Sequence, residues 1–260
     1  MLFKDPLNRT IEITRTPQRI ISLVPSLTEL LVDLGLENNL IGITKFCIYP
    51  KQLLKTKTIV GGTKQIHLDR IKYLKPDFIL CNKEENTQKI VAEVAQVAAT
   101  YVSDIYTIKD TLELIKELGI ILDCKQQATI IRKQIEEERN KFLEYIKNKT
   151  QKKVVYFIWA NPYMVVGGNN FINEMLTLNK FKNIYATSNR YPEINLAELK
   201  ETDYVLLSSE PFPFKTKHKE LFIKHTKAKI ILVEGEPFSW YGSRLIKAFE
   251  YFKKLHISLE

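Results

Sequence analysis

The feature that most constrains the fold is an uninterrupted helical stretch in the middle of the chain. Residues 125 to 149, KQQATIIRKQIEEERNKFLEYIKNK, contain no glycine and no proline. Ile131, Ile135, Phe142 and Ile146 follow one another at spacings of four, seven and four residues, which places them on one side of an α-helix. A helix of about 24 residues is ~36 Å long at about 1.5 Å per residue. That length is enough to connect two domains.

Short β-branched runs alternate with amphipathic stretches on both sides of this helix. Arg19–Val24 is followed by Leu27–Leu34 in the first half, and Val154–Trp159 is followed by Phe171–Leu178 in the second. This alternation is typical of a mostly parallel sheet with helices on its faces. The alternation therefore predicts one α/β unit in each half of the chain.

The two halves also share a local pattern. HLDRIKYLKPDFILCNKE in the first half and NLAELKETDYVLLSSE in the second both read as a helix that leads into a strand through an acidic residue, Asp77 or Asp203. Such a match also arises by convergence between βα units. Together with the long helix, it predicts an α/β fold of two Rossmann-like lobes, each a mostly parallel sheet flanked by helices, joined by one backbone helix. We expect an N-terminal lobe over residues 1–123, a connecting helix over 124–150 and a C-terminal lobe over 151–260.

Charge and composition are those of an ordinary globular protein. Hydrophobic residues make up 45% of the 260 residues and charged residues 27%. The formal charge of +9 comes from lysines spread along the chain, not from a basic stripe, so we expect no nucleic-acid partner. The longest apolar runs, such as VVYFIWA, have the length of a strand, which predicts no transmembrane helix.

The N-terminal sequence and the cysteines leave the cellular compartment of the protein open. The N-terminal sequence MLFKDPLNRTIEITRTPQRIISL lacks the features of a secretory signal, so we expect either that a signal has been removed or that the protein is cytoplasmic. Cys47, Cys81 and Cys124 are odd in number and have no C-x-x-C spacing. They predict reduced thiols without a disulfide framework, which favours the cytoplasm slightly.

The loops at the carboxyl ends of the predicted strands are the expected ligand edge, because open parallel sheets bind ligands there. In the second half these loops contain both tryptophans of the chain, Trp159 and Trp240, with Tyr163 and Tyr241 beside them. Aromatic residues in such loops often only cover the edge of a sheet. Two exposed tryptophans favour a cleft for a large, flat, partly apolar ligand.

Motifs of catalysis and of metal binding are missing. The sequence has no G-x-S-x-G, no H-E-x-x-H and neither glycine-rich phosphate loop. The four histidines are spread singly, and only His67 is placed to meet a ligand at the edge. We therefore predict no catalytic residue, no metal site and no enzymatic activity.

Four further patterns have local structural explanations. Ser26-Leu-Thr-Glu29 and Asn195-Leu-Ala-Glu198 are interpreted as capping boxes. Gly61–Gly62 and Gly167–Gly168 precede predicted helices, so their N–H groups could face an anion, and tight turns explain these glycines equally well.

Four segments carry a resemblance to a known family. They are PQRIISLVPSLTELLVDLGL (17–36), IGITKFCIYP (41–50), VGGTKQIHLDRIKYLKPDFILCNKEEN (60–86) and EPFSWYGSRLIKAFEYF (236–252). In this order they resemble the helical-backbone, or class III, substrate-binding proteins that serve ABC importers of cobalamin, haem and siderophores. The cobalamin-binding periplasmic members are most similar, because they share the YP at Tyr49–Pro50 and the NP at Asn161–Pro162.

The resemblance implies a function and a set of site residues. A corrinoid ligand, cobalamin or a related metal-tetrapyrrole, would be captured in a cleft between the lobes by a monomer and delivered to the permease and ATPase of an ABC importer. No cofactor would serve as a catalyst, and the protein would lie in the periplasm or cell envelope. The implied ligand contacts are Pro25, Ser26, Tyr49, Gly62, Thr63, Lys64, His67, Trp159, Tyr163, Trp240, Tyr241 and Arg244. Glu84 and Glu210, paired by the internal repeat, are the nominated permease-docking residues.

Departures from the family pattern keep alternatives open. Cobalamin-type proteins carry an aromatic residue where Thr63 stands here. A haem binder would offer a tyrosine or histidine, such as Tyr49 or His67, and a siderophore binder would place several arginines in the cleft, where only Arg190 and Arg244 are expected. A cytoplasmic tetrapyrrole-handling protein or an enzyme such as a chelatase is the remaining alternative.

Overall fold

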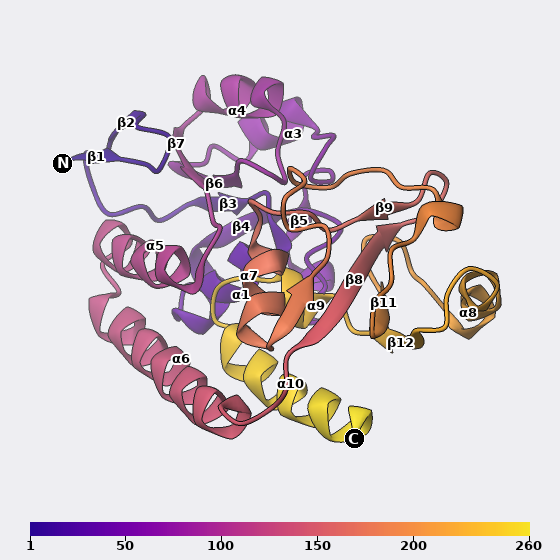
Figure 1. Ribbon diagram of the computed structural model, residues 1–260. Helices are drawn as coiled ribbons and strands as arrows, with labels where there is room; N and C mark the ends of the chain where they lie inside the picture. The colour runs from indigo at the N-terminus through magenta and orange to yellow at the C-terminus, as the bar shows by residue number, and fades with distance from the viewer. The chain divides into compact units, whose positions relative to one another are not determined.

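A computed structural model describes all residues from 1 to 260 (Figure 1). The chain forms two compact units and passes between them several times. The first unit consists of Met1–Ile105, Lys109–Glu136 and Tyr241–Arg244, and the second consists of Tyr106–Ile108, Glu137–Trp240 and Leu245–Glu260. Each unit is described by itself below.

The first unit is built on a five-stranded parallel sheet. Its strands are β3 (Ile20–Ser22), β4 (Leu40–Ile43), β5 (Thr58–Ile59), β6 (Phe78–Asn82) and β7 (Ala99–Ser103), in the order β5-β4-β3-β6-β7. Every pair in this sheet is parallel. β6 is buried along its whole length, as expected of a central strand covered on both faces. A separate hairpin of β1 (Leu2–Lys4) and β2 (Thr10–Glu12) precedes the sheet.

Helices connect and cover these strands. They are α1 (Pro25–Asp33), η1 (Glu37–Asn39), α2 (Leu53–Thr56), α3 (Leu68–Tyr73), α4 (Gln88–Ala95) and α5 (Ile108–Ile121), of which α5 begins in the second unit. α3 and α4 pack their apolar sides on one face of the sheet through Ile71, Ile90 and Val94, which join Ile21 and Ile79 in one core cluster. This helix and strand alternation is the predicted one.

The second unit repeats the architecture. Its strands are β8 (Lys152–Trp159), β9 (Met164–Val165), β10 (Phe181–Asn183), β11 (Tyr204–Ser208) and β12 (Lys229–Val233). The parallel order is β10-β8-β11-β12, and β9 pairs with β8 in the antiparallel direction. The helices are α7 (Phe171–Leu178), η2 (Leu196–Glu198), α8 (Thr216–Ile223), α9 (Glu236–Ser239) and α10 (Leu245–Leu259).

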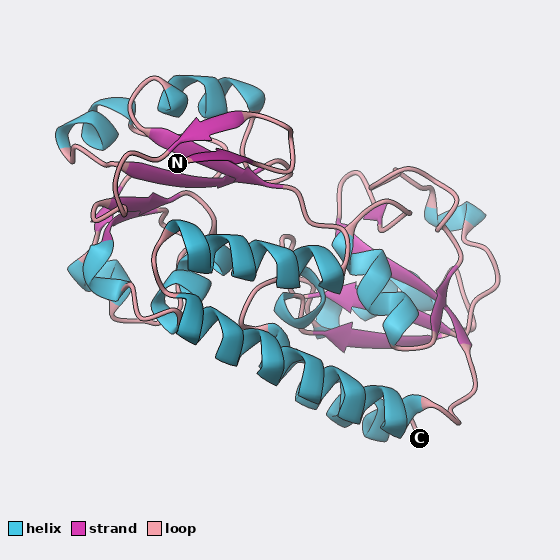
Figure 2. Ribbon diagram, turned by 90° about the vertical axis from the view of Figure 1, so that its left-hand side faces the viewer, coloured by secondary structure: helices cyan, strands magenta, loops and turns pink.

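The long mid-chain helix is α6 (Lys125–Ile146), which Figure 2 shows as one continuous helix without a kink. Its N-terminal half belongs to the first unit and its C-terminal half to the second. Phe142, at the predicted apolar stripe, is fully buried and packs on Phe249 and Phe252 of α10, with ring centroids 6.0 and 5.8 Å away. The prediction of a long helix at this position is confirmed, with an end three residues before the expected one.

The acidic residue that leads into a strand has the same role in both units. The carboxylate of Asp77, just before β6, accepts hydrogen bonds from the backbone N–H groups of Gln18 and Arg19, ahead of β3, at 2.9 and 2.8 Å. The carboxylate of Asp203, just before β11, accepts one from the N–H of Lys153 in β8 at 2.7 Å. In each unit the aspartate thus fixes the register of the strand beside its own. The shared order β4-β3-β6-β7 and β10-β8-β11-β12 agrees with an internal repeat.

Some local predictions need correction. The capping box at Ser26–Glu29 is wrong: α1 begins at Pro25 with Val24 as its N-cap, so Ser26 and Glu29 lie inside the helix. Asn195 does act as a cap, since its side chain accepts from the N–H of Ala197, but the element is a short 3-10 turn. The terminal helix begins at Leu245, one residue after the expected Arg244.

The two units do not coincide with the residues before and after the long helix α6. Residues 241 to 244, close to the C-terminal end of the chain, group with the first unit. The boundaries at residues 123 and 150 stay a prediction. No helix combines the length and the apolar character that crossing a membrane requires. All three cysteines are free thiols, and Cys47 and Cys81 are buried.

We expect His256 to make the fold less stable as the pH falls from about 6.5 toward 4. His256 stacks on Phe181 and contacts Asn179 Oδ1 through Nε2 at 3.2 Å. Burial, with a smaller effect of the charge of Lys149, lowers the pKa of His256 to about 4. Between these pH values the unfolded chain binds a proton that the folded chain does not, so the free energy of unfolding decreases by ~2 kcal/mol.

Urea unfolding at pH 7 and pH 4.5 measures this loss. His256→Gln, which keeps a hydrogen-bonding side chain, should lose stability less steeply with acid than the wild type. His225→Gln, at an exposed position, serves as the control. An unchanged pH dependence in His256→Gln would contradict the assignment.

Candidate ligand-binding site

Two of the predicted ligand contacts meet inside the first unit, at the carboxyl edge of its sheet. Tyr241 is only 7% exposed and Ser26 6% exposed. The Tyr241 hydroxyl lies beside those of Ser26 and Ser103, the last residue of β7, and near the carboxylate of Glu85. Burial, and then the charge of Glu85, raises the pKa of Tyr241 far above its usual range. Ser26 and Tyr241 therefore help to hold the edge together.

Arg244 and Tyr49 meet at the same edge. The guanidinium of Arg244 binds the carboxylate of Glu29 in α1 with two hydrogen bonds, Nε to Oε2 at 2.6 Å and a terminal nitrogen to Oε1 at 3.0 Å. Its central carbon lies 4.2 Å from the centre of the Tyr49 ring. The side chains of Arg244 and Glu29 are 14% and 7% exposed. The guanidinium thus joins α1, the loop that carries Tyr49 and residues 241 to 244.

The predicted contacts from Gly62 to His67 form a tight turn. The N–H of Gly62 donates to the carbonyl of Gln65 at 2.6 Å, and the N–H of His67 donates to the carbonyl of Val60 at 2.8 Å. Gly61 has φ of +125°, and a Cβ there would lie 2.5 Å from the Gln65 oxygen. The turn explains these glycines, and the Gly62 N–H points at a carbonyl and not at an anion. Lys64 and His67 have exposed side chains.

The second glycine pair has a comparable explanation. The N–H groups of Gly167 and Gly168 donate to the carbonyls of Arg190 and Ser188, both at 2.7 Å. A Cβ on either glycine would collide with the backbone of the facing segment. Close approach of two backbones, without an anion, requires both glycines.

The aromatic residues predicted in the second unit separate into two groups. Trp159, the last residue of β8, is 39% exposed and packs edge-on against Phe212 at a centroid distance of 5.8 Å. Tyr163 packs against Phe157 and Phe222, where it covers the core. Trp240 is only 8% exposed, because the α9 turn directs it inward, so the expectation of two exposed tryptophans holds for Trp159 alone.

The nominated docking residues lie at equivalent positions. Glu84 follows the end of β6 by two residues, and its N–H donates to Oδ1 of Asn82 at 2.8 Å. Glu210 follows the end of β11 by two residues, and its N–H donates to the hydroxyl of Ser208 at 3.3 Å. Both side chains are half-buried, and Oε1 of Glu210 accepts a hydrogen bond from Ser239 at 2.6 Å.

Two exposed apolar side chains at this edge of the first unit were not among the predicted ligand contacts, although their loop belongs to the expected ligand edge. Phe46 is 49% exposed and Ile48 41% exposed, in the loop that follows β4. The available signal was the placement of large apolar residues immediately after a strand. The same pattern also describes residues that pack under a loop.

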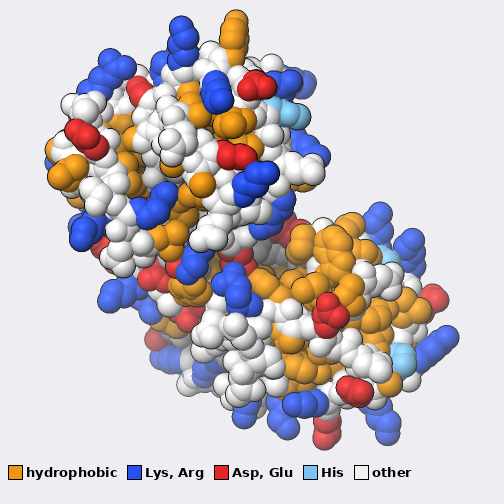
Figure 3. Space-filling view, turned by 90° about the horizontal axis from the view of Figure 1, so that it is seen from above, with side chains coloured by type: hydrophobic (Ala, Val, Ile, Leu, Met, Phe, Trp, Pro, Cys, Tyr) orange, Lys and Arg blue, Asp and Glu red, His pale blue; other side chains and the backbone are white.

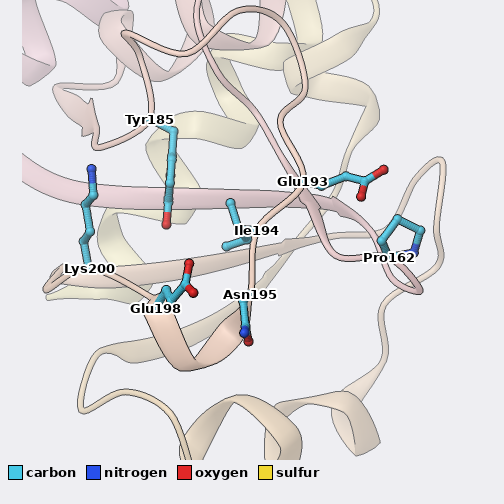
Figure 4. Close-up of a pocket in the computed structure, with 7 residues that line it drawn as sticks. All are labelled: Pro162, Tyr185, Glu193, Ile194, Asn195, Glu198 and Lys200. Atoms are coloured by element: carbon cyan, nitrogen blue, oxygen red, sulfur yellow. The ribbon is translucent and has the colours of Figure 1, made fainter.

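A cavity of about 390 Å³ opens in the second unit beside the predicted contact Tyr163, because Pro162 and Ile194 line it and the N–H of Ile194 donates to the carbonyl of Tyr163 at 2.9 Å. Figure 4 shows Tyr185, Ile194, Glu198 and Lys200 around it, with Pro162 and Glu193 on the other side, and Asn195 completes the lining. On the face in Figure 3, hydrophobic side chains gather in a broad area while lysines and arginines are dispersed. No three His, Cys, Asp or Glu side chains form a metal-binding group.

Comparison with known proteins identifies the relatives of this chain. The model of a family described as periplasmic binding protein matches residues 20–227. The vitamin B12-binding protein of Photorhabdus laumondii is 27% identical over 241 residues, which cover 90% of this chain and 86% of that protein. An uncharacterized ABC transporter substrate-binding lipoprotein of Bacillus subtilis, YvrC, is 27% identical over 191 residues, which cover 70% of this chain and 60% of that protein.

Solved structures share the fold. The periplasmic vitamin B12 binding protein BtuF of Vibrio cholerae superposes with a TM-score of 0.78 at 21% identity, covering 94% of this chain and 99% of BtuF. The periplasmic heme-binding protein RhuT of Roseiflexus sp. RS-1 gives 0.78 at 17% identity, covering 91% of this chain and 98% of RhuT. At these identities the likeness shows the fold alone, and the two-lobed α/β prediction is confirmed.

Arg244→Met should destabilise the first unit. The substitution leaves the carboxylate of Glu29 buried without its cation, which costs ~3 kcal/mol of unfolding free energy. The double variant Glu29→Leu with Arg244→Met removes both charges and should recover most of that loss. Urea unfolding followed by circular dichroism measures both.

Arg15→Met is the matched control. Arg15 forms an exposed ion pair with Asp77 at 3.9 Å, so its loss should cost less than ~1 kcal/mol. Equal stability of Arg15→Met and Arg244→Met would show that the Glu29 pair is energetically unimportant.

Proposed function

The chain belongs to the periplasmic binding protein family, and we propose that it is a non-enzymatic substrate-binding protein that captures a corrinoid and delivers it to an ABC importer. The observation that carries this proposal is Trp159, a tryptophan at the carboxyl end of β8 that packs on Phe212 and stays 39% exposed. An indole held in place and left open to solvent suits a flat, partly apolar ligand. Similarity to vitamin B12-binding proteins supports a corrinoid as that ligand.

The ligand contacts proposed here lie at the carboxyl edges of the two sheets. Trp159 and Tyr49 would contact the macrocycle, and Lys64 and His67, exposed beside the turn at Gly62, would meet its polar periphery. Pro25, Thr63 and Tyr163 are half-buried at this edge of their units. Ser26, Trp240, Tyr241 and Arg244 would act by shaping the edge, because their side chains are mostly buried.

Haem is the second candidate ligand. Its support is the likeness to the heme-binding protein RhuT, whose TM-score equals that of BtuF. Tyr49 and His67 are the side chains that would approach haem iron. Arg244 lies against the Tyr49 ring and is paired with Glu29. Haem propionates attract arginines that have no other carboxylate partner, so this pairing favours the corrinoid.

Delivery would use an envelope-located monomer that docks on a permease. Glu84 and Glu210 are proposed to meet basic residues of that permease, one from each unit, with the ATPase on the other side of the membrane. Their equivalent positions after β6 and β11 support the pairing. Exposed ion pairs are each worth only ~0.2–1 kcal/mol, so the glutamates would mainly orient the complex.

Titration of the protein with cyanocobalamin and with haemin, followed by tryptophan fluorescence, tests the ligand. We expect strong quenching by cyanocobalamin. Trp159→Phe should lose most of the quenching and weaken binding about tenfold, as expected for loss of an anchoring indole. Trp240→Phe, which keeps an aromatic ring at a mostly buried position that shapes the edge, should weaken binding less than Trp159→Phe does. Quenching by neither compound would contradict the proposal, and quenching by haemin alone would favour the second candidate.

Charge reversal tests docking separately. Glu84→Lys with Glu210→Lys should bind cyanocobalamin as the wild type does and should lose association with its permease in liposomes, with the largest effect at low salt. Glu113→Lys, on the exposed side of α5, is the control. Unchanged uptake with the double variant would exclude this pair as the docking residues.

A further inference from the structure

A further cavity lies in the second unit, at the amino edge of its sheet. Its volume is about 270 Å³. Its lining comes from the first residues of three parallel strands, Lys152 of β8, Phe181 of β10 and Tyr204 of β11, and from the last turn of α10. Trp159 ends β8 seven residues after Lys152, ~23 Å away at about 3.3 Å per residue. This cavity is therefore separate from the carboxyl edge that carries Trp159.

The buried part of the lining is aromatic. Phe181 is 2% exposed and stacks on the ring of His256, with the ring centroids 5.1 Å apart and the planes at 26°. Tyr204 meets Phe181 edge-on at a centroid distance of 6.3 Å, and Leu259 adds an aliphatic side chain. Burial lowers the pKa of His256 to about 4, so its ring is uncharged at pH 7. Such a surface suits a flat aromatic ring.

Lysines bring positive charge to the same cavity. Lys149 and Lys152 both line it. The ammonium nitrogen of Lys149 lies 5.1 Å from the centre of the Tyr145 ring, which holds it on one side. The ammonium group of Lys180 donates to the carbonyl of Lys149 at 3.1 Å, so the backbone that carries Lys149 is anchored as well. A cation held in place loses little entropy when it binds an anion.

A carboxylate of the chain itself uses this cation. Lys149 forms an ion pair with Glu260, which also lines the cavity. The side chain of Glu260 is 62% exposed, so water and salt weaken the contact. A carboxylate attached to an aromatic ring would gain the burial of that ring in addition, which the glutamate side chain cannot supply.

We propose that this cavity binds a small aromatic carboxylate, with its ring against Phe181 and His256 and its carboxylate on Lys149 in place of Glu260. The volume restricts the ligand to about one ring, because pockets for drug-sized ligands measure roughly 300–1,000 Å³. Lys152 supplies a second ammonium group to the same anion. The site does not rest on the proposed function, because it lies at the opposite edge of the second sheet from Trp159.

Nuclear magnetic resonance titration of the full chain with benzoate tests this site. We expect the ring resonances of His256 to shift with a dissociation constant on the order of 1 mM, which is ordinary for a ligand of one ring. Benzyl alcohol lacks the charge and cyclohexanecarboxylate lacks the aromatic ring. Each should bind more weakly than benzoate by about fivefold or more.

The two partners of the ion pair should respond in opposite directions. Lys149→Gln removes the cation and should weaken benzoate binding about tenfold. Glu260→Gln removes the competing carboxylate and should strengthen the binding about threefold. Lys141→Gln is the matched control, because Lys141 is an exposed lysine of α6 that pairs with Glu138 and lines no part of the cavity. Thermal unfolding of each variant verifies folding.

Each outcome decides the assignment. Benzoate binding that shifts the His256 resonances, with opposite effects of the two variants, supports it. Equal affinity for benzoate and benzyl alcohol, or equal weakening by both variants, would show that Lys149 does not recognise the carboxylate and would overturn it. Shifts confined to the carboxyl edge, or no shifts with benzoate at many times the expected dissociation constant, would overturn it as well. None of these results depends on whether the protein binds cyanocobalamin.

Discussion

The guanidinium of Arg244 organises the candidate site of the first unit. Its two hydrogen bonds to Glu29 fix the first turns of α1, and its contact with Tyr49 fixes the loop after β4. The same side chain anchors residues 241 to 244, which bring Tyr241 next to Ser26 and Ser103. A cation buried to this extent is stable only with its carboxylate, so the edge of the sheet is built around one ion pair.

Patterns that depend on neighbours in sequence were predictable. The strands β6 and β11 and the helix α6 follow from short-range periodicity, and Asp77 and Asp203 could be paired before any contact was known. The correspondence works because an aspartate before a strand satisfies N–H groups of the adjacent strand wherever the motif recurs. Such a rule needs no knowledge of distant residues.

Contacts between distant residues were not predictable. Glu29 and Arg244 are separated by 215 positions, so Glu29 looked like a helix-capping residue and Arg244 like a ligand contact. Trp240 looked exposed because it lies in a loop, yet the α9 turn buries it. The exposure of Phe46 and Ile48 was not predictable, because it depends on how Cys47 is anchored by Thr28 and Thr44. Each of these outcomes is decided by tertiary packing.

The route of the chain has a consequence for biosynthesis. The first unit receives residues 241 to 244 only after all the strands from β1 to β12 have been synthesised. Until Arg244 leaves the ribosome, the carboxylate of Glu29 has no guanidinium and Tyr241 does not fill the space beside Ser26. The carboxyl edge of the first sheet is therefore completed only after Tyr241 and Arg244 have been synthesised, long after the strands of that sheet.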